Sequence, residues 1–235
     1  MRPIRVLLAV PLIALDTLVF GCAAMLVGLL DRTGRMCRRL ARTWARLLLR
    51  GLGVRVEVTG GGNVPAGPAV YAANHGSALD IPILFGYLPV DFRIIHKRSL
   101  YLIPLIGWTL YLAGHVGIDR GNAFRAHRSL KAAAGRIRAG TSVAVFPEGT
   151  RSPDARVRPF KRGTFVLALE AQVPVVPLSL AGVKRVAPRG LLTLTPGTVR
   201  LAIHPPVATV GLGPEAAESL AEDVRQVVAQ GAEAA

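Results

Sequence analysis

Residues 6–30, VLLAVPLIALDTLVFGCAAMLVGLL, form a long apolar run in which Asp16 is the single charged residue. About 20 consecutive apolar residues are enough to cross a bilayer, so this run is long enough to span one. Basic residues flank it on both sides: Arg2 and Arg5, then Arg32, Arg35, Arg38 and Arg39. Because positive charge marks neither end as the cytoplasmic one, we expect residues 4–30 to dip into one leaflet and return.

A cleaved signal peptide is the alternative for this start, since VFGC at 19–22 loosely resembles a lipoprotein cleavage site. Phe20 is bulky for such a site, and Asp16 interrupts the apolar stretch. The chain has two cysteines, Cys22 and Cys37, which provide neither a disulfide framework nor a metal-ligand cluster. We therefore predict a reducing compartment and a monotopic protein on the cytoplasmic face of the inner membrane.

Residues 35–50, RMCRRLARTWARLLLR, are the most periodic segment of the chain. At 100° per residue, one side of a helix is basic and the other carries leucines and Trp44. This pattern is typical of a helix in a membrane interface, although an ordinary surface helix of the domain is the alternative. The predicted membrane-binding residues are Arg35, Arg38, Arg39, Arg42, Trp44 and Arg46, with Arg50 on the same basic side.

After Gly53 the pattern changes to alternating strands and helices, which predicts an α/β domain with a single mixed, largely parallel sheet flanked by helices. We expect strands near 54–59, 69–74, 92–96, 116–118, 142–146, 174–180, 191–195 and 199–204. Helices are expected at 78–87, 100–112, 123–138, 164–171 and 214–229. TPGT at 195–198 is expected to join two antiparallel strands. The predicted organisation is N-terminal membrane-associated helices at 1–52 and an α/β domain at 53–235.

The net charge of +15 over 235 residues implies an anionic partner, which could be a lipid headgroup, a nucleic acid or a phosphorylated substrate. A hydrophobic fraction of 51% favours a membrane. Nucleic acid is disfavoured because the densest basic segment, 35–50, has a lipid-like opposite side and lacks interleaved aromatic residues.

The stretch YAANHGSALDIP at 71–82 places Asp80 five residues after His75, at the end of a predicted buried strand. Open α/β sheets gather their ligands at the carboxyl ends of strands, so this histidine is a candidate base and the aspartate its orienting group. The alternative is a capping box, in which Ser77 caps the following helix and Asp80 bonds back to it. That alternative leaves His75 unexplained.

A second group of polar residues follows other predicted strands. FPEGTRS at 146–152 contains Glu148, Gly149, Thr150 and Arg151, and FKRGT at 160–164 contains Lys161 before a helix. GHVGIDR at 114–120 ends in Arg120, and Lys97 follows the strand at 92–96. Taken singly, such cations are more often solvated surface charges than ligands.

In this order the blocks NHxxxxD, GHVGIDR, FPEGTRS and VPVVPLSL (173–180) resemble the glycerolipid acyltransferase family, over residues 70 to 181. Within that family the sequence most resembles the bacterial 1-acylglycerol-3-phosphate acyltransferases. One departure is Gly117, which stands where the family often carries an aromatic residue. The resemblance implies an enzyme that transfers an acyl chain from acyl-CoA or acyl carrier protein to the sn-2 hydroxyl of a lysophospholipid, most simply lysophosphatidate, giving phosphatidate.

The resemblance also implies roles for the quoted residues. His75 and Asp80 would be catalytic, because a neutral imidazole can remove the hydroxyl proton while a carboxylate stabilises the resulting imidazolium. The acceptor phosphate would be held by Arg120 and Arg151, with Lys97 and Lys161 as secondary candidates. The predicted substrate-orienting residues are Asn74, Glu148, Gly149 and Thr150.

Two alternatives remain at this point. The acceptor could be another lysolipid, such as a lyso-ornithine lipid, or the chain could be a non-catalytic membrane-binding homologue. No metal or other cofactor is expected, because the sequence shows no cysteine and histidine cluster. The expected partners are the lysolipid acceptor, the acyl donor and an anionic membrane surface, with no nucleic acid.

Overall fold

The computed structural model describes residues 2–119, 123–154, 156–188 and 193–233. The strands are β1 (Val54–Thr59), β2 (Val70–Ala73), β3 (Phe92–Lys97), β4 (Val116–Ile118), β5 (Ser142–Val145), β6 (Val175–Ala181) and β8 (Gly197–Ile203). The α-helices are α1 (Arg2–Leu30), α2 (Arg35–Gly51), α3 (Asp80–Tyr87), α4 (Ile106–Leu112), α5 (Ala123–Arg138), α6 (Gly163–Ala171), α7 (Val183–Val186) and α8 (Ala217–Glu233). Short 3-10 helices are η1 (Gly61–Asn63), η2 (Arg98–Leu102) and η3 (Pro214–Ala216).

The described strands form one seven-stranded sheet in the order β1-β8-β6-β2-β5-β3-β4. Every neighbouring pair is parallel except β6 and β8, which confirms the predicted mixed, largely parallel sheet. β8 therefore finds its antiparallel partner in β6, and the turn predicted at 195–198 is wrong, because β8 begins within it at Gly197. The strand predicted at 191–195 falls partly outside the described residues, and residues 193–196 are not in a strand.

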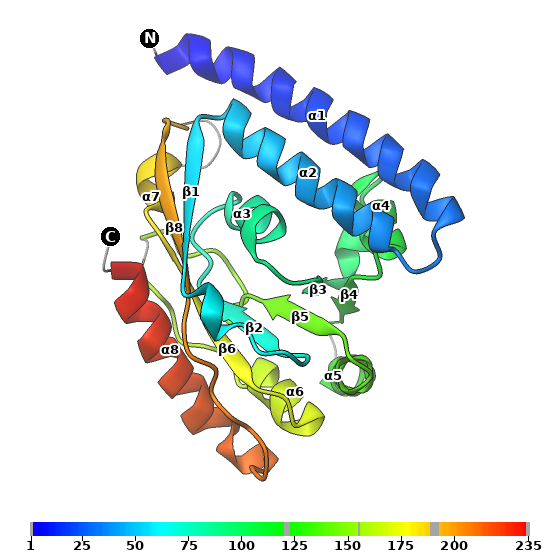
Figure 1. Ribbon diagram of the computed structural model, residues 1–235, viewed down its shortest axis with the longest axis vertical. Coiled ribbons are helices and arrows are strands. Elements are labelled where there is room, and N and C mark those ends of the chain that lie inside the picture. The colour runs from blue at the N-terminus through cyan, green and yellow to red at the C-terminus, as the bar shows by residue number, and fades with distance from the viewer. Residues whose placement is uncertain (1, 120–122, 155, 189–192, 234–235) are drawn as a thin grey trace.

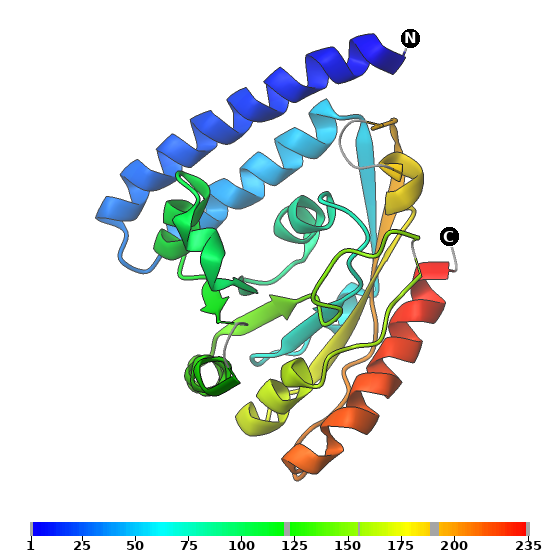
Figure 2. The ribbon, with the colours of Figure 1, turned by 180° about the vertical axis from the view of Figure 1, so that it is seen from behind.

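Helices cover both faces of the sheet, with α2 and α3 on one face and α5, α6 and α8 on the other (Figures 1 and 2). Side chains alternate across a strand, and β2 illustrates this. Tyr71 and Ala73 enter the core beneath α2 and α3, whereas Val70 and Ala72 enter the core beneath α5, α6 and α8. All four residues of β2 are buried, so the strand carries its following turn to a fixed place at the centre of the sheet.

The apolar run is one uninterrupted helix, α1, with Pro11 inside it. The expected return within residues 4–30 is therefore wrong, since the chain reverses at the following turn and runs back as α2 beside α1 (Figure 1). Asp31 fixes that turn by accepting the Met36 backbone N–H at 2.7 Å, within the first turn of α2. By length and composition, residues 13–30 could cross a membrane, and 11% of that window is buried in the protein.

Helix α2 belongs to the domain core as well as to the helix pair. Leu48 and Leu49 share a hydrophobic cluster with Tyr71 of β2 and Leu84 of α3. The predicted boundary at residue 52, between the N-terminal helices and the α/β domain, stays a prediction. Helix α2, which precedes this boundary, packs on the sheet that follows it.

The basic side of α2 is not uniformly free, contrary to the expectation that it faces lipid headgroups as a whole. The side chain of Arg38 is 9% exposed and forms an ion pair with Asp91 at 2.6 Å. Arg42 donates to the backbone oxygens of Leu88 and Val90, and Arg46 donates to that of Gly86. These three arginines bind the end of α3 and the loop after it, because helix C-termini leave carbonyls without partners. Arg35, Arg39 and Arg50 stay exposed, and Trp44 is half-buried against the core.

The helix predicted at 100–112 is broken in two. Residues 98–102 form η2, and α4 begins only at Ile106. Pro104 disfavours helix before it, and Leu105 has a positive φ of 64°. The break turns the apolar residues of this segment outward, and Leu102 is 83% exposed.

Candidate active site

The turn between β2 and α3 carries the predicted dyad. The Nδ1 atom of His75 lies 2.7 Å from Oδ2 of Asp80, and the aspartate side chain is fully buried. The same Oδ2 accepts the backbone N–H groups of Gly76 at 2.7 Å and Ser77 at 2.8 Å. A carboxylate oxygen has no hydrogen to donate, so it acts as acceptor in the contact with His75 as well. The hydrogen in that contact therefore lies on Nδ1 of His75. The lone pair of the imidazole therefore lies on Nε2, the atom that can receive a proton.

The bond expected of the capping alternative and the contact expected of the dyad are both present in this turn. The Ser77 N–H donates to Oδ2 of Asp80 at 2.8 Å, and the Leu79 N–H donates to Ser77 Oγ at 3.3 Å. Helix α3 begins at Asp80 with Leu79 as its N-cap, so Ser77 is not the capping residue that the alternative expected. One carboxylate thus holds the turn before α3 and contacts the His75 ring at the same time. The spacing of five residues follows from this, because Asp80 reaches back over a single turn.

The backbone of His75 is held by the loop that follows β5. Its N–H donates to Oε1 of Glu148 at 2.7 Å, and its carbonyl accepts the Ser152 N–H at 2.7 Å. The imidazole ring stacks on Phe146 with the ring centroids 4.1 Å apart. Together with Asp80, these contacts fix the ring from four directions and leave its side chain 15% exposed.

Glu148 is a buried residue whose carboxylate joins two loops. Its second oxygen accepts the Arg158 backbone N–H at 3.3 Å, ten residues further along the same loop. Burial raises the pKa of this carboxyl, and the two backbone donors partly offset that effect. Both carboxylate oxygens of Glu148 thus accept backbone hydrogens, and one of these bonds holds the His75 backbone. The substrate-orienting role of Glu148 stays a prediction.

Asn74 is also engaged by the protein. Its side-chain amide donates to the Leu180 oxygen at 3.0 Å and accepts the Leu180 N–H at 2.8 Å. These two bonds imitate a backbone pairing and extend the contact between β2 and β6 by one residue. Asn74 is 7% exposed, and its side chain holds the end of the strand that precedes His75. Its substrate-orienting role stays a prediction.

Several predicted cations gather at the same edge of the sheet. Lys97 ends β3, and Arg151 lies in the loop after β5; both are exposed. Lys161 is exposed and lies against Gly149, where an added Cβ would stand 2.7 Å from the lysine Nζ. Gly149 has a φ of 78°, so a glycine suits this position for its backbone as well as for its space. Thr150 is exposed beside Arg151. Arg120 lies outside the described residues.

Comparison with known proteins identifies the family of the chain. The family model described as Acyltransferase matches residues 55–181, which contain the dyad and Glu148. The chain belongs to the acyltransferase family. The acyltransferase is 37% identical over 171 residues to the chloroplastic 1-acyl-sn-glycerol-3-phosphate acyltransferase BAT2 of Brassica napus, covering 72% of the chain and 49% of that relative.

Two further relatives extend the comparison. The acyltransferase is 37% identical over 175 residues to human 1-acyl-sn-glycerol-3-phosphate acyltransferase alpha, with 74% and 62% of the two chains covered. It spans only about half to three fifths of the length of these two relatives. The crystal structure of the 1-acyl-sn-glycerophosphate (LPA) acyltransferase PlsC from Thermotoga maritima superimposes with a TM-score of 0.82 at 33% identity. That match covers 99% of this chain and 97% of the other, so the N-terminal helices are included.

At Gly117, where the resemblance leads us to expect an aromatic residue, the structure shows what lies beside the glycine. A Cβ at Gly117 would lie 2.5 Å from the ring of Tyr101. The Tyr101 hydroxyl donates to the His115 backbone oxygen at 2.7 Å, just before β4. An aromatic ring from η2 thus lies against Gly117.

Sequence reasoning missed four contacts to the dyad and its support: the Phe146 ring, the Ser152 N–H, the Arg158 N–H and the Leu180 backbone. Phe146 and Ser152 lie within the FPEGTRS block, so the sequence indicated where they lie in the chain but not that they contact His75. The Arg158 contact depends on how the loop after β5 folds back, and the Leu180 contact depends on which strands are neighbours. No local pattern in the sequence contains that information.

Proposed function

We propose that the chain is a 1-acylglycerol-3-phosphate acyltransferase, which acylates the sn-2 hydroxyl of lysophosphatidate and produces phosphatidate. The observation that carries the proposal is the His75–Asp80 pair, with Nε2 left as the base at the carboxyl end of a central parallel strand. The two relatives compared above are both 1-acyl-sn-glycerol-3-phosphate acyltransferases by name, which supports the choice of acceptor.

In the proposed reaction, Nε2 of His75 takes the proton of the acceptor hydroxyl as its oxygen attacks the carbonyl carbon of the thioester. Asp80 stabilises the imidazolium that forms. The tetrahedral intermediate then collapses, the carbon–sulfur bond breaks, and the leaving thiolate takes the proton from Nε2. The products are an ester and a free thiol, and the histidine returns to its starting state.

The acceptor phosphate would be bound by Arg151 and by Arg120, with Lys97 and Lys161 adding positive charge. A guanidinium can contact phosphate through two parallel N–H groups, which an ammonium cannot do. The donor in this proposal is acyl-CoA or acyl carrier protein, and both are anionic molecules that suit a chain of net charge +15. The proposed chemistry requires no metal or other cofactor.

The test uses the purified chain with two acceptors, lysophosphatidate and lysophosphatidylcholine, and follows thiol release from acyl-CoA and from acyl carrier protein. We expect turnover with lysophosphatidate, and we expect Arg151→Ala to raise the KM for that acceptor while leaving the weaker reaction with lysophosphatidylcholine unchanged. Equal activity on the two acceptors, or equal losses in Arg151→Ala, would reject the assignment of the acceptor. Incubation with a chelator should leave turnover unchanged.

We further propose that the protein is monotopic, on the cytoplasmic face of the inner membrane. The C-terminal half of α1 packs against α2 through Ala24 and Cys37, and against α4 through Gly28 and Leu112. A perpendicular α1 would carry the adjoining charges of α2 toward the hydrocarbon, at about 2.5–3.5 kcal/mol for each charge at its centre. Single cysteines near residues 3 and 33, in a background lacking Cys22 and Cys37, should react from one side of sealed vesicles. Labelling from opposite sides would establish a span.

A further inference from the structure

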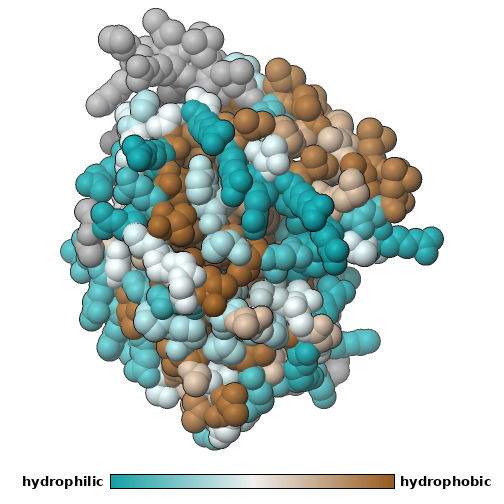
Figure 3. Space-filling view, viewed as in Figure 1, coloured by the Kyte–Doolittle hydropathy of each residue, from teal (hydrophilic) through white to brown (hydrophobic). Residues whose placement is uncertain are grey.

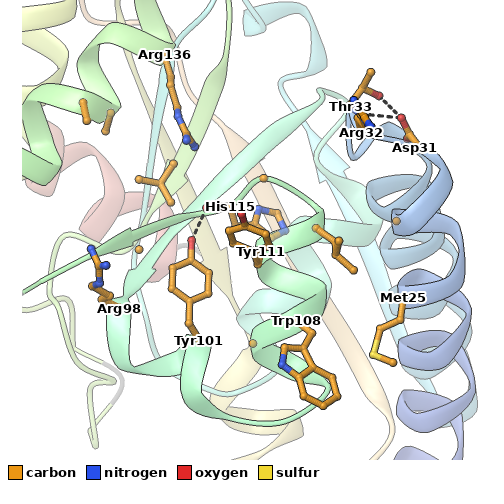
Figure 4. Close-up of a pocket in the computed structure, with 18 of the residues that line it drawn as sticks. Met25, Asp31, Arg32, Thr33, Arg98, Tyr101, Trp108, Tyr111, His115 and Arg136 are labelled. Carbon is orange, nitrogen blue, oxygen red and sulfur yellow. Dashed lines mark hydrogen bonds between the residues drawn. The ribbon is translucent and has the colours of Figure 1, made fainter.

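A cavity of about 1060 Å³ lies beside the edge strand β4, between α1, α4 and α5 (Figure 4). None of the residues that surround His75 lines it. In the sheet, β5 and β3 separate β4 from β2. With neighbouring strands about 4.8 Å apart, β4 lies about 14 Å from the strand that carries the dyad. The cavity therefore does not contain the dyad, although Arg98 in its wall directly follows Lys97.

One wall of the cavity is apolar and aromatic. It is formed by Met25 and Leu29 of α1 and by Trp108, Tyr111 and Leu112 of α4. Trp108 is 55% exposed and Tyr111 is 74% exposed, so both rings stand at the rim. Exposed apolar side chains also occur on α1, at Leu26 and Leu30, and on η2 and the start of α4, at Leu102, Ile103 and Ile106. Figure 3 shows this hydrophobic area at the end of α1 remote from the N-terminus. Such a wall suits a hydrocarbon chain.

The opposite side of the cavity is cationic. Figure 4 shows Arg98 and Arg136 across from α1, and Arg32 at the end of α1. Arg98 and Arg136 are exposed, and neither side chain makes a hydrogen bond or ion pair with any residue that the structure describes. Two guanidinium groups held without an anion beside an apolar wall match a ligand that is anionic at one end.

Asp31 offsets only part of this positive charge. Its carboxylate accepts the Thr33 N–H, the Thr33 hydroxyl and the Met36 N–H, and these bonds, that of Met36 first, lower its pKa to about 2. It is the single acidic residue among the described residues that line the cavity, and it stands against the three arginines Arg32, Arg98 and Arg136. The lining therefore keeps a positive balance.

Tyr101 occupies part of the edge strand β4. The Tyr101 hydroxyl bonds to the His115 oxygen, and its ring covers Gly117. Because a strand needs free backbone groups to add to a sheet edge, these contacts oppose a peptide as the ligand. A small amphiphile fits both walls better.

We propose that this cavity binds one molecule of an anionic phospholipid, separate from the acceptor and the donor. Its phosphate would lie on Arg98 and Arg136, and one acyl chain would lie along Met25, Leu29 and Trp108. Guanidinium groups bind phosphate with charge-assisted hydrogen bonds, and tryptophan and tyrosine favour the boundary between headgroup and hydrocarbon. A lipid bound there contacts α1, α4 and α5 together, and so fastens the N-terminal helix to the sheet edge on anionic membranes.

The test uses Trp108 as the reporter. The chain has two tryptophans, so the full-length Trp44→Phe variant leaves Trp108 as the one source of indole fluorescence. The protein is placed in phosphatidylcholine nanodiscs that contain an increasing small fraction of phosphatidylglycerol with brominated acyl chains. We expect quenching that saturates at a low fraction of this lipid, whereas brominated phosphatidylcholine quenches in proportion to its amount. Millimolar inorganic phosphate should not displace the lipid, because it lacks the chain.

Two pairs of substitutions test the cations in the same background. The double variant Arg98→Gln with Arg136→Gln should bind the anionic lipid more weakly, by about tenfold in affinity for each arginine. The double variant Arg98→Lys with Arg136→Lys should retain part of that affinity. Lys131→Gln with Arg55→Gln removes the same net charge outside the cavity and should change nothing. Equal quenching by both lipids, or an equal loss in the control pair, would overturn the proposal. Displacement by acyl-CoA would also overturn it, since the cavity would then belong to the donor. Acyl transfer, measured in parallel, shows separately whether the proposed function holds.

Discussion

The turn after β2 and helix α2 both carry polar residues that the sequence singles out, and they use those residues in different ways. In the turn, the carboxylate of Asp80 is fully buried and bonds to three donors within five residues. In α2, Arg38 and Arg42 reach groups about 50 residues away, at Asp91 and Leu88. The first arrangement is local and closes on itself, whereas the second depends on where α3 and its following loop lie.

This difference explains which predictions held. Spacing within a single turn restricts the geometry strongly, because few backbone conformations connect the two residues. Helical periodicity shows which residues share a side but not what that side contacts. Arginine adds to the uncertainty because its long side chain can turn from solvent toward a carbonyl without any change in the backbone.

The largest expected effect is at the centre of the turn. His75→Ala should lower acyl transfer about 10²–10⁴-fold, because it removes the base while the fold keeps its other contacts. Steady-state assays with lysophosphatidate measure the loss, and thermal unfolding checks that the variant folds. Turnover close to wild type would show that the turn is a structural cap alone.

The second prediction tests whether the position of His75 depends on Glu148, which lies 73 residues away in the sequence. Glu148→Ala leaves the His75 N–H without its acceptor, and displacing His75 by about 1 Å can cost on the order of 10²-fold in turnover. Glu148→Gln retains one acceptor oxygen, so its loss should be smaller. We expect kcat to fall while the KM for lysophosphatidate stays close to wild type, since Glu148 acts through His75. A change confined to KM would place Glu148 on the acceptor.

On the other side of the comparison, Arg38→Ala should lower the free energy of unfolding by about 2 kcal/mol, because it removes charge-assisted bonds from a nearly buried side chain. Arg39→Ala is the matched control on the same helix. Arg39 is exposed, so its loss should change stability by less than about 0.5 kcal/mol. Chemical denaturation measures both. Equal stabilities of the two variants would mean that the contacts of Arg38 do not stabilise the fold, and would favour membrane binding as the role of all the arginines of α2.

The smallest effect concerns His115, a buried histidine near Arg38. Burial lowers its pKa to about 3, with smaller contributions from His96, Arg93 and Arg38, and its Nδ1 accepts the Ile94 N–H. The unfolded chain binds a proton near pH 6.5 and the folded chain does not, so stability falls as pH drops from about 6.5 toward 3.

Between pH 7 and pH 5 we expect this histidine to account for a loss of about 1–2 kcal/mol in the free energy of unfolding. His115→Gln keeps an acceptor for Ile94 and cannot titrate, so its stability should depend less on pH over this range. Denaturation curves of the two proteins at pH 5 and pH 7 provide the measurement. Parallel curves would mean that His115 is protonated in the folded state as well.

The sequence by itself determined the elements that depend on neighbours in the chain. It predicted the α/β class, the helices over 123–138 and 164–171 within a residue at each end, and the pairing of His75 with Asp80. The apolar runs and the capping pattern restrict local conformation, and buried strands such as β2 read as continuous apolar stretches. The family blocks added the expected chemistry at the strand ends.

Only the tertiary structure decided what comes together from distant segments. Strand order put Glu148 beneath His75 and Leu180 beside Asn74, and it made Tyr101 cover Gly117. Packing turned Arg38, Arg42 and Arg46 from a presumed lipid surface toward backbone carbonyls, and it left α4 exposed beside α1. The physical reason is that a buried polar group must find a partner wherever the folded chain offers one, and sequence distance places no limit on that partner.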